Sequence, residues 1–138
     1  CNCGGHGCLE QVASATGIAR TARRLLAADS RPSSLRSLKN ISAKNVLDAA
    51  KAGDELALDS LNKSCYYLGW VLATLSMVLD PQAYIIGGGV SKAGTFLTDM
   101  IKKYHDELSP MATKKADIVL AKLGNDAGIY GAAKLILG

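Results

Sequence analysis

Three cysteines stand within the first eight residues of the chain, in the stretch CNCGGHGCLE. Cys1 and Cys3 are too close in sequence to form an unstrained disulfide. Three thiolates that converge from one loop are instead a soft ligand set suited to zinc, and glycines let such a loop wrap tightly because they adopt backbone angles closed to other residues. Cys1, Cys3 and Cys8 therefore predict a structural zinc site.

Structural zinc takes four protein ligands, and the three cysteines leave the fourth open. His6 lies inside the loop and could close the site. The chain begins with Cys1 rather than Met, so we expect it to be cut from a longer one, and a residue before Cys1 is the alternative ligand. The third alternative is that no zinc binds. Cys65 lies on an apolar helical stripe and is better explained as a small buried side chain.

Glu10 follows the last of these cysteines by two residues, in the first turn of a predicted helix. A carboxylate near a helix N-terminus is favourable without any function, and the residues alone favour this explanation. The functional alternative is a carboxylate that the metal loop holds rigidly, so that it accepts hydrogen bonds from a polar ligand.

A glycine-rich turn in AYIIGGGVSKAG is the second candidate site. It matches neither the Walker A pattern nor G-x-G-x-x-G. Gly87, Gly88 and Gly89 nevertheless remove side chains at the carboxyl end of a predicted strand, where a ligand could lie against the backbone. A tight turn is the purely structural alternative. In the later stretch LGNDAGIYGAA, small residues four apart predict close packing of a helix on the sheet.

The elements that position these residues predict an α/β class. Helices are expected over 9–29, 42–52 and 54–79, and again from about 93 to 104. Buried strands are expected at 83–86 and from 117 onward, followed by a closing helix with Asn125 as its candidate N-cap. The helix over 54–79 is apolar nearly all round, which indicates burial in a larger core. Two strands make no stable sheet alone, so further strands are expected elsewhere.

The composition is that of an ordinary soluble domain. The 138 residues are 49% hydrophobic and 20% charged, with a net charge of +4. The basic residues are scattered and lack interleaved aromatics, which argues against a nucleic-acid partner. The longest uncharged run, residues 64–79, is too short for a membrane span, so we expect a cytoplasmic protein with no membrane partner.

Taken together, these stretches resemble the ROK family of bacterial sugar kinases and sugar-responsive repressors. CNCGGHGCLE matches the family's zinc signature C-x-C-G-x-x-G-C-x-E, and AYIIGGGVSKAG looks like its adenosine-contacting turn. The resemblance, closest to the family's glucokinases, implies an actin-like, ribonuclease-H-like ATPase fold with sugar and ATP between two lobes. Residues 1–138 would be most of the C-terminal lobe, with a zinc loop at residues 1–10.

The resemblance also implies roles for individual residues. The three cysteines of the loop would bind zinc with a histidine from the preceding segment, which leaves His6 without that role. Glu10 would bind a sugar hydroxyl. Five residues would line the ATP site: Gly87, Gly88, Gly89, Val90 and Asn125.

The function that the resemblance implies is part of an ATP- and Mg-dependent hexose kinase, converting D-glucose to glucose 6-phosphate in a homodimeric full-length protein. The family's aspartate base has no counterpart in these residues, so no catalytic residue is assigned and the chain alone is expected to be inactive. The alternatives are the effector-binding domain of a ROK-type repressor and a zinc-stapled interaction domain.

Overall fold

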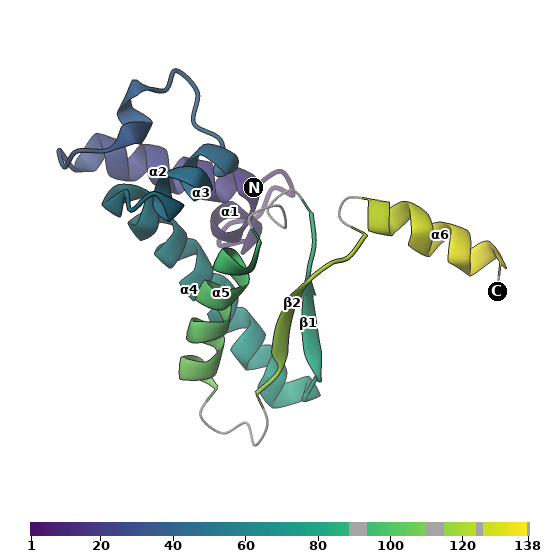
Figure 1. Cartoon of the computed structure of the whole chain (residues 1–138). Coiled ribbons are helices and arrows are strands. Elements are labelled where there is room, and N and C mark those ends of the chain that lie inside the picture. The colour runs from purple at the N-terminus through teal and green to yellow at the C-terminus, as the bar shows by residue number, and fades with distance from the viewer. Residues whose placement is uncertain (89–93, 110–114, 124–125, 138) are drawn as a thin grey trace.

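The computed structural model describes residues 1–88, 94–109, 115–123 and 126–137. Among these residues, no helix is long and apolar enough to cross a membrane. The elements follow one another as α1 (Glu10–Ala13), α2 (Ala15–Ala28), a 3-10 helix (Ser34–Ser37), α3 (Ala43–Lys51), α4 (Glu55–Leu79), β1 (Ala83–Ile86), α5 (Thr95–Leu108), β2 (Asp117–Leu120) and α6 (Ala127–Leu137) (Figure 1).

The sheet confirms the predicted α/β class. β1 and β2 pair in parallel, with Ala83 opposite Asp117 and Ile86 opposite Leu120, and α5 lies between them in the chain. A parallel pair needs such a crossover, because the chain must return to the same edge before the second strand begins. The glycine-rich turn therefore follows the carboxyl end of β1, beside the carboxyl end of the parallel strand β2.

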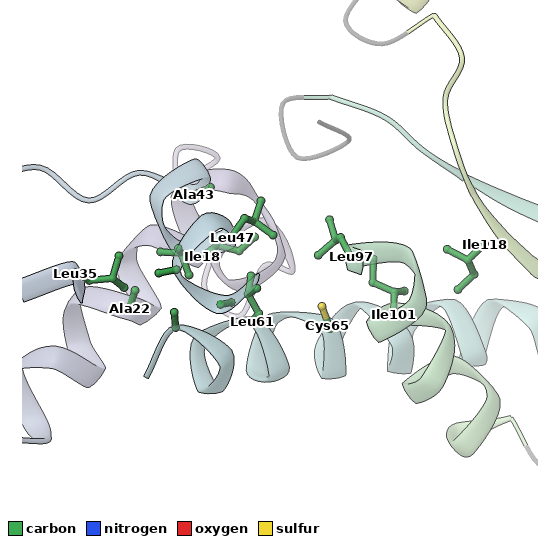
Figure 2. Close-up of a cluster of buried hydrophobic side chains, with 14 of the residues drawn as sticks. Ile18, Ala22, Leu35, Ala43, Leu47, Leu61, Cys65, Leu97, Ile101 and Ile118 are labelled. Carbon is green, nitrogen blue, oxygen red and sulfur yellow. The ribbon is translucent and has the colours of Figure 1, made fainter. Parts of the chain in front are cut away.

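The core lies between the helices, along one side of α4. Figure 2 shows apolar side chains from α2, α3 and α5 meeting this helix, and Leu61, Cys65 and Ile101 are almost completely buried there. Burial of Cys65 confirms the prediction of a small buried side chain. Burial raises the pKa of the Cys65 thiol to about 12, so it stays protonated.

The predicted continuous helix over 9–29 is wrong, because the chain breaks at Ser14. Ser14 is extended, ends α1, and accepts a hydrogen bond from the amide of Gly17 at 3.0 Å as the N-cap of α2. A Cβ on Gly17 would lie 2.8 Å from the carbonyl oxygen of Gln11. The absent side chain lets the first turn of α2 pack directly on the backbone of α1.

Side-chain caps start the next two helices. Ser42 caps α3, as predicted, in a reciprocal capping box with Asn45. Asp54 caps α4 by accepting from the amide of Ala57, and it also accepts from both Ser33 and Ser34. One carboxylate thus starts α4 and holds the connection after α2 against it.

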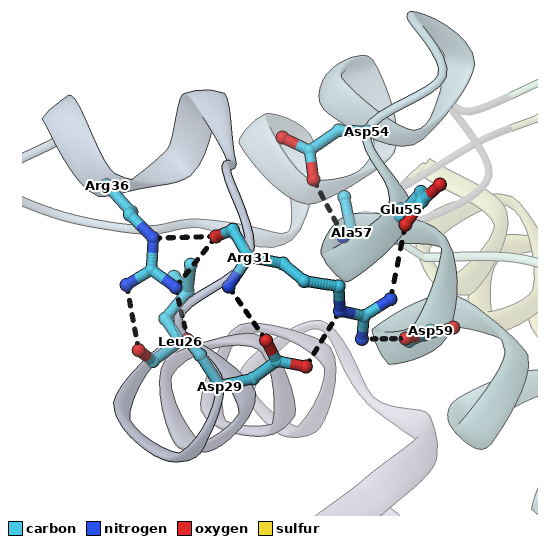
Figure 3. Close-up of polar contacts among 8 residues, drawn as sticks. All are labelled: Leu26, Asp29, Arg31, Arg36, Asp54, Glu55, Ala57 and Asp59. Carbon is cyan, nitrogen blue, oxygen red and sulfur yellow. Dashed lines mark hydrogen bonds and ion pairs between the residues drawn. The ribbon is translucent and has the colours of Figure 1, made fainter.

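Arg31 belongs to the same connection and also binds it to α4 (Figure 3). The Arg31 guanidinium pairs with Asp29 at 2.8 Å, with Asp59 at 2.6 Å and with Glu55 at 3.3 Å. These carboxylates raise the pKa of Arg31 above its usual range, chiefly through the hydrogen bond to Asp59. Arg36 donates to the carbonyl oxygens that end α2 and begin the connection.

Helices α4 and α5 approach each other closely at a glycine. A Cβ on Gly69 would lie 2.6 Å from the Cβ of Tyr104, so only glycine fits this crossing. The neighbouring His105 is fully buried, and its ring nitrogens lie 2.8 Å from Ser76 Oγ and 2.8 Å from Asp106 Oδ1. Both ring nitrogens of this buried histidine therefore have hydrogen-bond partners.

Three expectations of burial are wrong for this chain. Helix α4 is buried along one side only, and Trp70 and Val78 are exposed. Strand β1 is covered on one face, while Ile85 is 71% exposed on the other. Helix α6 stands apart from the other elements (Figure 1), and none of its described residues is buried. A Cβ placed on Gly128 would meet nothing within 4 Å beyond its chain neighbours and the backbone of its own helix. The described parts of the chain supply no second layer to cover these surfaces.

Candidate metal and ligand site

The three predicted thiols meet at the start of the chain. The Sγ atoms of Cys1, Cys3 and Cys8 all lie within 4.8 Å of one another, and those of Cys3 and Cys8 are 3.5 Å apart. All four cysteines of the chain are free. The loop therefore brings together three sulfur ligands that lie up to seven positions apart in the sequence.

Glycines shape the loop, as the sequence indicates. Gly4 and Gly7 have φ angles of 80° and 73°, in the left-handed region that favours glycine. A Cβ on Gly5 would lie 3.3 Å from Cys3 Sγ and 3.6 Å from Cys8 Sγ, in front of both sulfurs. The missing side chain leaves that space open for an ion.

The backbone of the loop favours a thiolate. The amide of Gly5 donates to Cys3 Sγ at 3.4 Å, and this bond, followed by the contact with Cys8, lowers the pKa of the Cys3 thiol below its usual value. A thiolate is the form that binds a metal. The amide of Gly5 therefore stabilises negative charge on the Cys3 sulfur, as a bound cation also would.

The geometry fits zinc. In a tetrahedral site with Zn–S bonds of about 2.3 Å, neighbouring sulfurs lie about 3.8 Å apart, close to the Cys3–Cys8 separation. Among the described residues, the only cluster of His, Cys, Asp and Glu side chains compact enough to hold a metal ion is this one, and the exposed His6 does not join it. His6 is thus not placed as the fourth ligand.

Glu10 begins α1, directly after the loop, and its carboxylate is exposed. It accepts hydrogen bonds from Gln11 Nε2 at 2.7 Å and from Ser14 Oγ at 3.2 Å, and Cys1 Sγ lies 3.8 Å from its Oε2. The carboxylate is therefore oriented by its own helix turn and touches the sulfur cluster, while remaining open to a ligand in solvent.

The glycine-rich turn is described only in part. Gly87 and Gly88 are exposed at the end of β1, and Gly88 has a φ of 81°. The amide of Ala121 donates to the carbonyl of Ile86 at 2.9 Å, so the backbones at the ends of β1 and β2 remain paired. The predicted residues Gly89, Val90 and Asn125 lie outside the described residues.

The two candidate sites approach each other beneath the surface. Ala13, the last residue of α1, and Ile86, the last residue of β1, line the same small cavity with Leu97 and Ile101 of α5. The helix that carries Glu10 and the strand that leads into the glycine turn are therefore packed onto the same part of the core.

Sequence reasoning missed the residues that fix α1 on α2. Gln11 Oε1 accepts from the guanidinium of Arg20, which also reaches the Gln11 carbonyl. Ser14 breaks the helix and Gly17 admits the close approach. A serine followed three residues later by glycine inside a predicted helix is the signal that could have located the break, because serine favours the N-cap position.

Known proteins are similar to this chain over nearly its whole length. The model of the ROK family matches residues 1–138. A glucokinase of Halalkalibacterium halodurans is 42% identical over 99% of this chain, which spans 42% of that protein. The structure of a ROK family glucokinase from Streptomyces griseus in complex with glucose and AMPPNP superposes with a TM-score of 0.84 at 33% identity, over 98% of this chain and 46% of its own.

A regulator gives a weaker match. The structure of a ROK family transcriptional regulator, a homologue of the E. coli MLC protein, has a TM-score of 0.77 at 32% identity, over 96% of this chain and 34% of its own. In each of these comparisons, the chain spans less than half the length of the protein that it matches.

Proposed function

The chain belongs to the ROK family, and from that premise we propose that it is part of an ATP-dependent hexose kinase that phosphorylates D-glucose. The observation that carries the proposal is the superposition of 98% of the chain on a ROK glucokinase bound to glucose and AMPPNP, an ATP analogue. The fold is therefore the actin-like ATPase fold, and the identity of 42% to a second glucokinase points to the same activity.

The chain would form most of the C-terminal lobe of that kinase. It spans 42% to 46% of the two glucokinases, and the open face of β1 and the uncovered α6 are surfaces that a further lobe would cover. The full-length protein would be a cytoplasmic homodimer. The 138 residues alone would not phosphorylate glucose, because phosphoryl transfer needs a base, magnesium and phosphate contacts assembled together.

Within this lobe, Glu10 would accept a hydrogen bond from a sugar hydroxyl. Its exposed carboxylate, oriented by Gln11 and Ser14, is preorganised for that contact. Gly87 and Gly88, together with the predicted Gly89, Val90 and Asn125, would form a wall for the nucleotide, since a surface without side chains lets a ligand approach the backbone.

Zinc would be held by Cys1, Cys3 and Cys8, with a fourth ligand from residues that precede Cys1 in a longer chain. The metal would be structural, since thiolate-rich sites of this kind stabilise a local fold. Zinc would affect sugar binding by fixing the position of Glu10, because Glu10 follows Cys8 by two residues and its carboxylate touches Cys1.

A chimera tests the proposal. The matching segment of the H. halodurans glucokinase is replaced by this chain, and glucose-dependent ADP formation is measured. We expect activity with glucose, and for Glu10→Gln a KM for glucose raised about tenfold or more, since a hydrogen bond to a charged group contributes about 1.5–3 kcal/mol. Glu107→Gln, at an exposed carboxylate on α5, is the matched control.

Two results would contradict the proposal. One is a folded chimera that phosphorylates neither glucose nor N-acetylmannosamine. The other is an unchanged KM for every hexose in the Glu10→Gln variant. Activity with N-acetylmannosamine alone would move the proposal to another hexose within the same reaction.

The alternative is the effector-binding domain of a sugar-responsive repressor, which the regulator of TM-score 0.77 supports. The longer chain decides between the two. A phosphate-binding turn before Cys1 would indicate the kinase, and a helix-turn-helix would indicate the repressor.

A further inference from the structure

The sulfurs of the loop are not equivalent. The Sγ atoms of Cys3 and Cys8 contact each other at 3.5 Å, whereas Cys1 Sγ contacts the carboxylate of Glu10 at 3.8 Å. We propose that Cys3 and Cys8 form a reversible disulfide when the loop meets a peroxide, so that the metal site is also an oxidation site with a defined pairing.

The loop can close this bond with little movement. A disulfide needs its sulfurs about 2.05 Å apart, so the two Sγ atoms must approach by roughly 1.5 Å. The four residues between the cysteines are Gly4, Gly5, His6 and Gly7, and three of them can adjust their backbone freely. Gly5 places no Cβ in front of either sulfur.

The other pairings are less favourable. Cys1 and Cys3 are separated by a single residue, and a disulfide closing so small a ring departs from the preferred geometry. The sulfurs of Cys1 and Cys8 lie within 4.8 Å of each other, but a bond between them would compete with the contact at 3.8 Å between Cys1 Sγ and Glu10 Oε2. The structure thus favours one pairing out of three.

Oxidants can reach this loop and cannot reach the fourth cysteine. Cys1 and Cys3 are exposed and Cys8 is half-buried, while Cys65 is 2% exposed inside the core. Reaction of a thiol requires access as well as a thiolate. Cys65 should therefore remain a free thiol during the oxidation.

The chemistry balances with hydrogen peroxide as the oxidant. The Cys3 sulfur attacks one peroxide oxygen, the O–O bond breaks, and Cys3 becomes a sulfenic acid as water leaves. The Cys8 sulfur then attacks Cys3, the S–O bond breaks, and a second water leaves. Two thiols lose two hydrogens and two electrons, and one peroxide becomes two waters.

The oxidised loop would not hold zinc. Each sulfur of a disulfide is bonded to the other and carries no thiolate charge for a metal, which leaves Cys1 as the sole thiolate of the site. Zinc does not change oxidation state, so oxidation would release it as Zn²⁺. Metal and disulfide therefore exclude each other at this loop, whether or not the full protein is a kinase.

Differential alkylation tests the pairing on the metal-free protein. The protein is treated with hydrogen peroxide and then unfolded in guanidinium chloride, so that the buried thiol also becomes accessible. Free thiols are blocked with iodoacetamide, and disulfides are then reduced and labelled with N-ethylmaleimide. Before alkylation, we expect a loss of about 2 Da relative to the untreated chain. Tandem mass spectrometry of two tryptic peptides, residues 1–20 with the loop cysteines and residues 64–92 with Cys65, then locates the labels.

The expected result is N-ethylmaleimide on Cys3 and Cys8 and carbamidomethyl on Cys1 and Cys65. Cys1→Ser should still lose about 2 Da and Cys3→Ser should not, although both remove one exposed sulfur from the loop. Cys65→Ser controls for the core thiol. Labels spread over all three loop cysteines, or a disulfide that requires Cys1, would overturn the proposal.

A second experiment tests whether zinc binding and the disulfide exclude each other. Reduced protein is loaded with zinc, and release is followed with a chromogenic chelator during peroxide treatment. We expect one zinc released for each disulfide formed, and recovery of binding after reduction with a phosphine. Zinc retained by the disulfide form, or no uptake by the reduced form, would overturn the exclusion. Neither readout depends on sugar phosphorylation.

Discussion

Helices α2 to α5 contain apolar residues similar to those of β1, β2 and α6, but bury more of them. In the first group of elements, Leu61 and Ile101 are completely buried. In the second group, Ile85 is 71% exposed and Leu135 is 89% exposed. Hydrophobic residues thus specify where a chain needs a partner, but the partner must be present before they contribute to stability.

This difference separates a closed half of the molecule from an open half. The closed half is held by side-chain caps, the Arg31 carboxylate cluster and the close crossing at Gly69. The open half holds the predicted nucleotide turn and the exposed strand face. The two halves should therefore respond differently to substitution.

Truncation of Leu61 should have the largest effect. Leu61→Ala removes a fully buried side chain at the centre of the core and should lower the free energy of unfolding by about 2–5 kcal/mol. Urea denaturation followed by circular dichroism measures it, with the half-exposed Leu123→Ala as the control. A loss below about 1 kcal/mol would mean that the closed half is not closely packed.

Addition of a methyl group at Gly69 should come next. In Gly69→Ala the new Cβ would lie 2.6 Å from Tyr104 Cβ, so α4 and α5 must separate, at a cost of about 1–3 kcal/mol. Gly128→Ala is the matched control, because a Cβ there would meet nothing within 4 Å beyond its chain neighbours and the backbone of its own helix. If the two variants unfold at the same denaturant concentration, the helix crossing is looser than described.

The contribution of Asp54 to stability should be smaller than that of Gly69 and should depend on pH. Partial burial acts to raise the pKa of this carboxyl, but hydrogen bonds from Ser34, Ala57 and Ser33 outweigh it and hold the pKa below the ordinary 3.8. A lowered folded-state pKa gives stability that is present above pH 3.8 and lost as the pH falls through the folded value.

Asp54→Asn should therefore cost about 1–2 kcal/mol at pH 7. The difference between the variant and the unmodified chain should shrink as the pH falls below 4, because only the unmodified chain has a carboxylate at position 54 to protonate. Chemical denaturation at several pH values measures this. Asp99→Asn, at an exposed position on α5, is the control. A difference that is independent of pH would contradict the assignment.

Truncation in the open half should have the smallest effect. Leu135→Ala removes the same side chain as Leu61→Ala, yet Leu135 is 89% exposed, so the free energy of unfolding should change by less than about 0.5 kcal/mol. A cost comparable to that of Leu61→Ala would show that α6 is covered in solution, for example by a second copy of the chain.

The sequence was sufficient for the features set by local chemistry. Periodicity and caps predicted helix α3, the start of α4 and strand β1 to within a residue or two, and the C-x-C-x4-C spacing predicted the meeting of the three thiols. Cysteine pattern and glycine placement are short-range signals, because the residues that define them are neighbours in the chain.

Features that depend on distant residues were not predictable in the same way. The break at Ser14 depends on how closely Gly17 can pack on α1, which the helical period does not reveal. The exposure of Ile85 and of α6 depends on which layers cover them, and an apolar pattern indicates a need for burial without identifying what meets it.

The contact between Gly17 and α1 has a consequence for the proposed binding of a sugar by Glu10. Glu10 lies in α1, and a Cβ on Gly17 of α2 would lie 2.8 Å from the carbonyl oxygen of Gln11 in that same turn, so no larger residue fits there. A larger residue at position 17 would push α1 away from α2 and would therefore displace the Glu10 carboxylate. A genetic screen for altered carbohydrate preference should therefore recover changes at a residue that no carbohydrate touches.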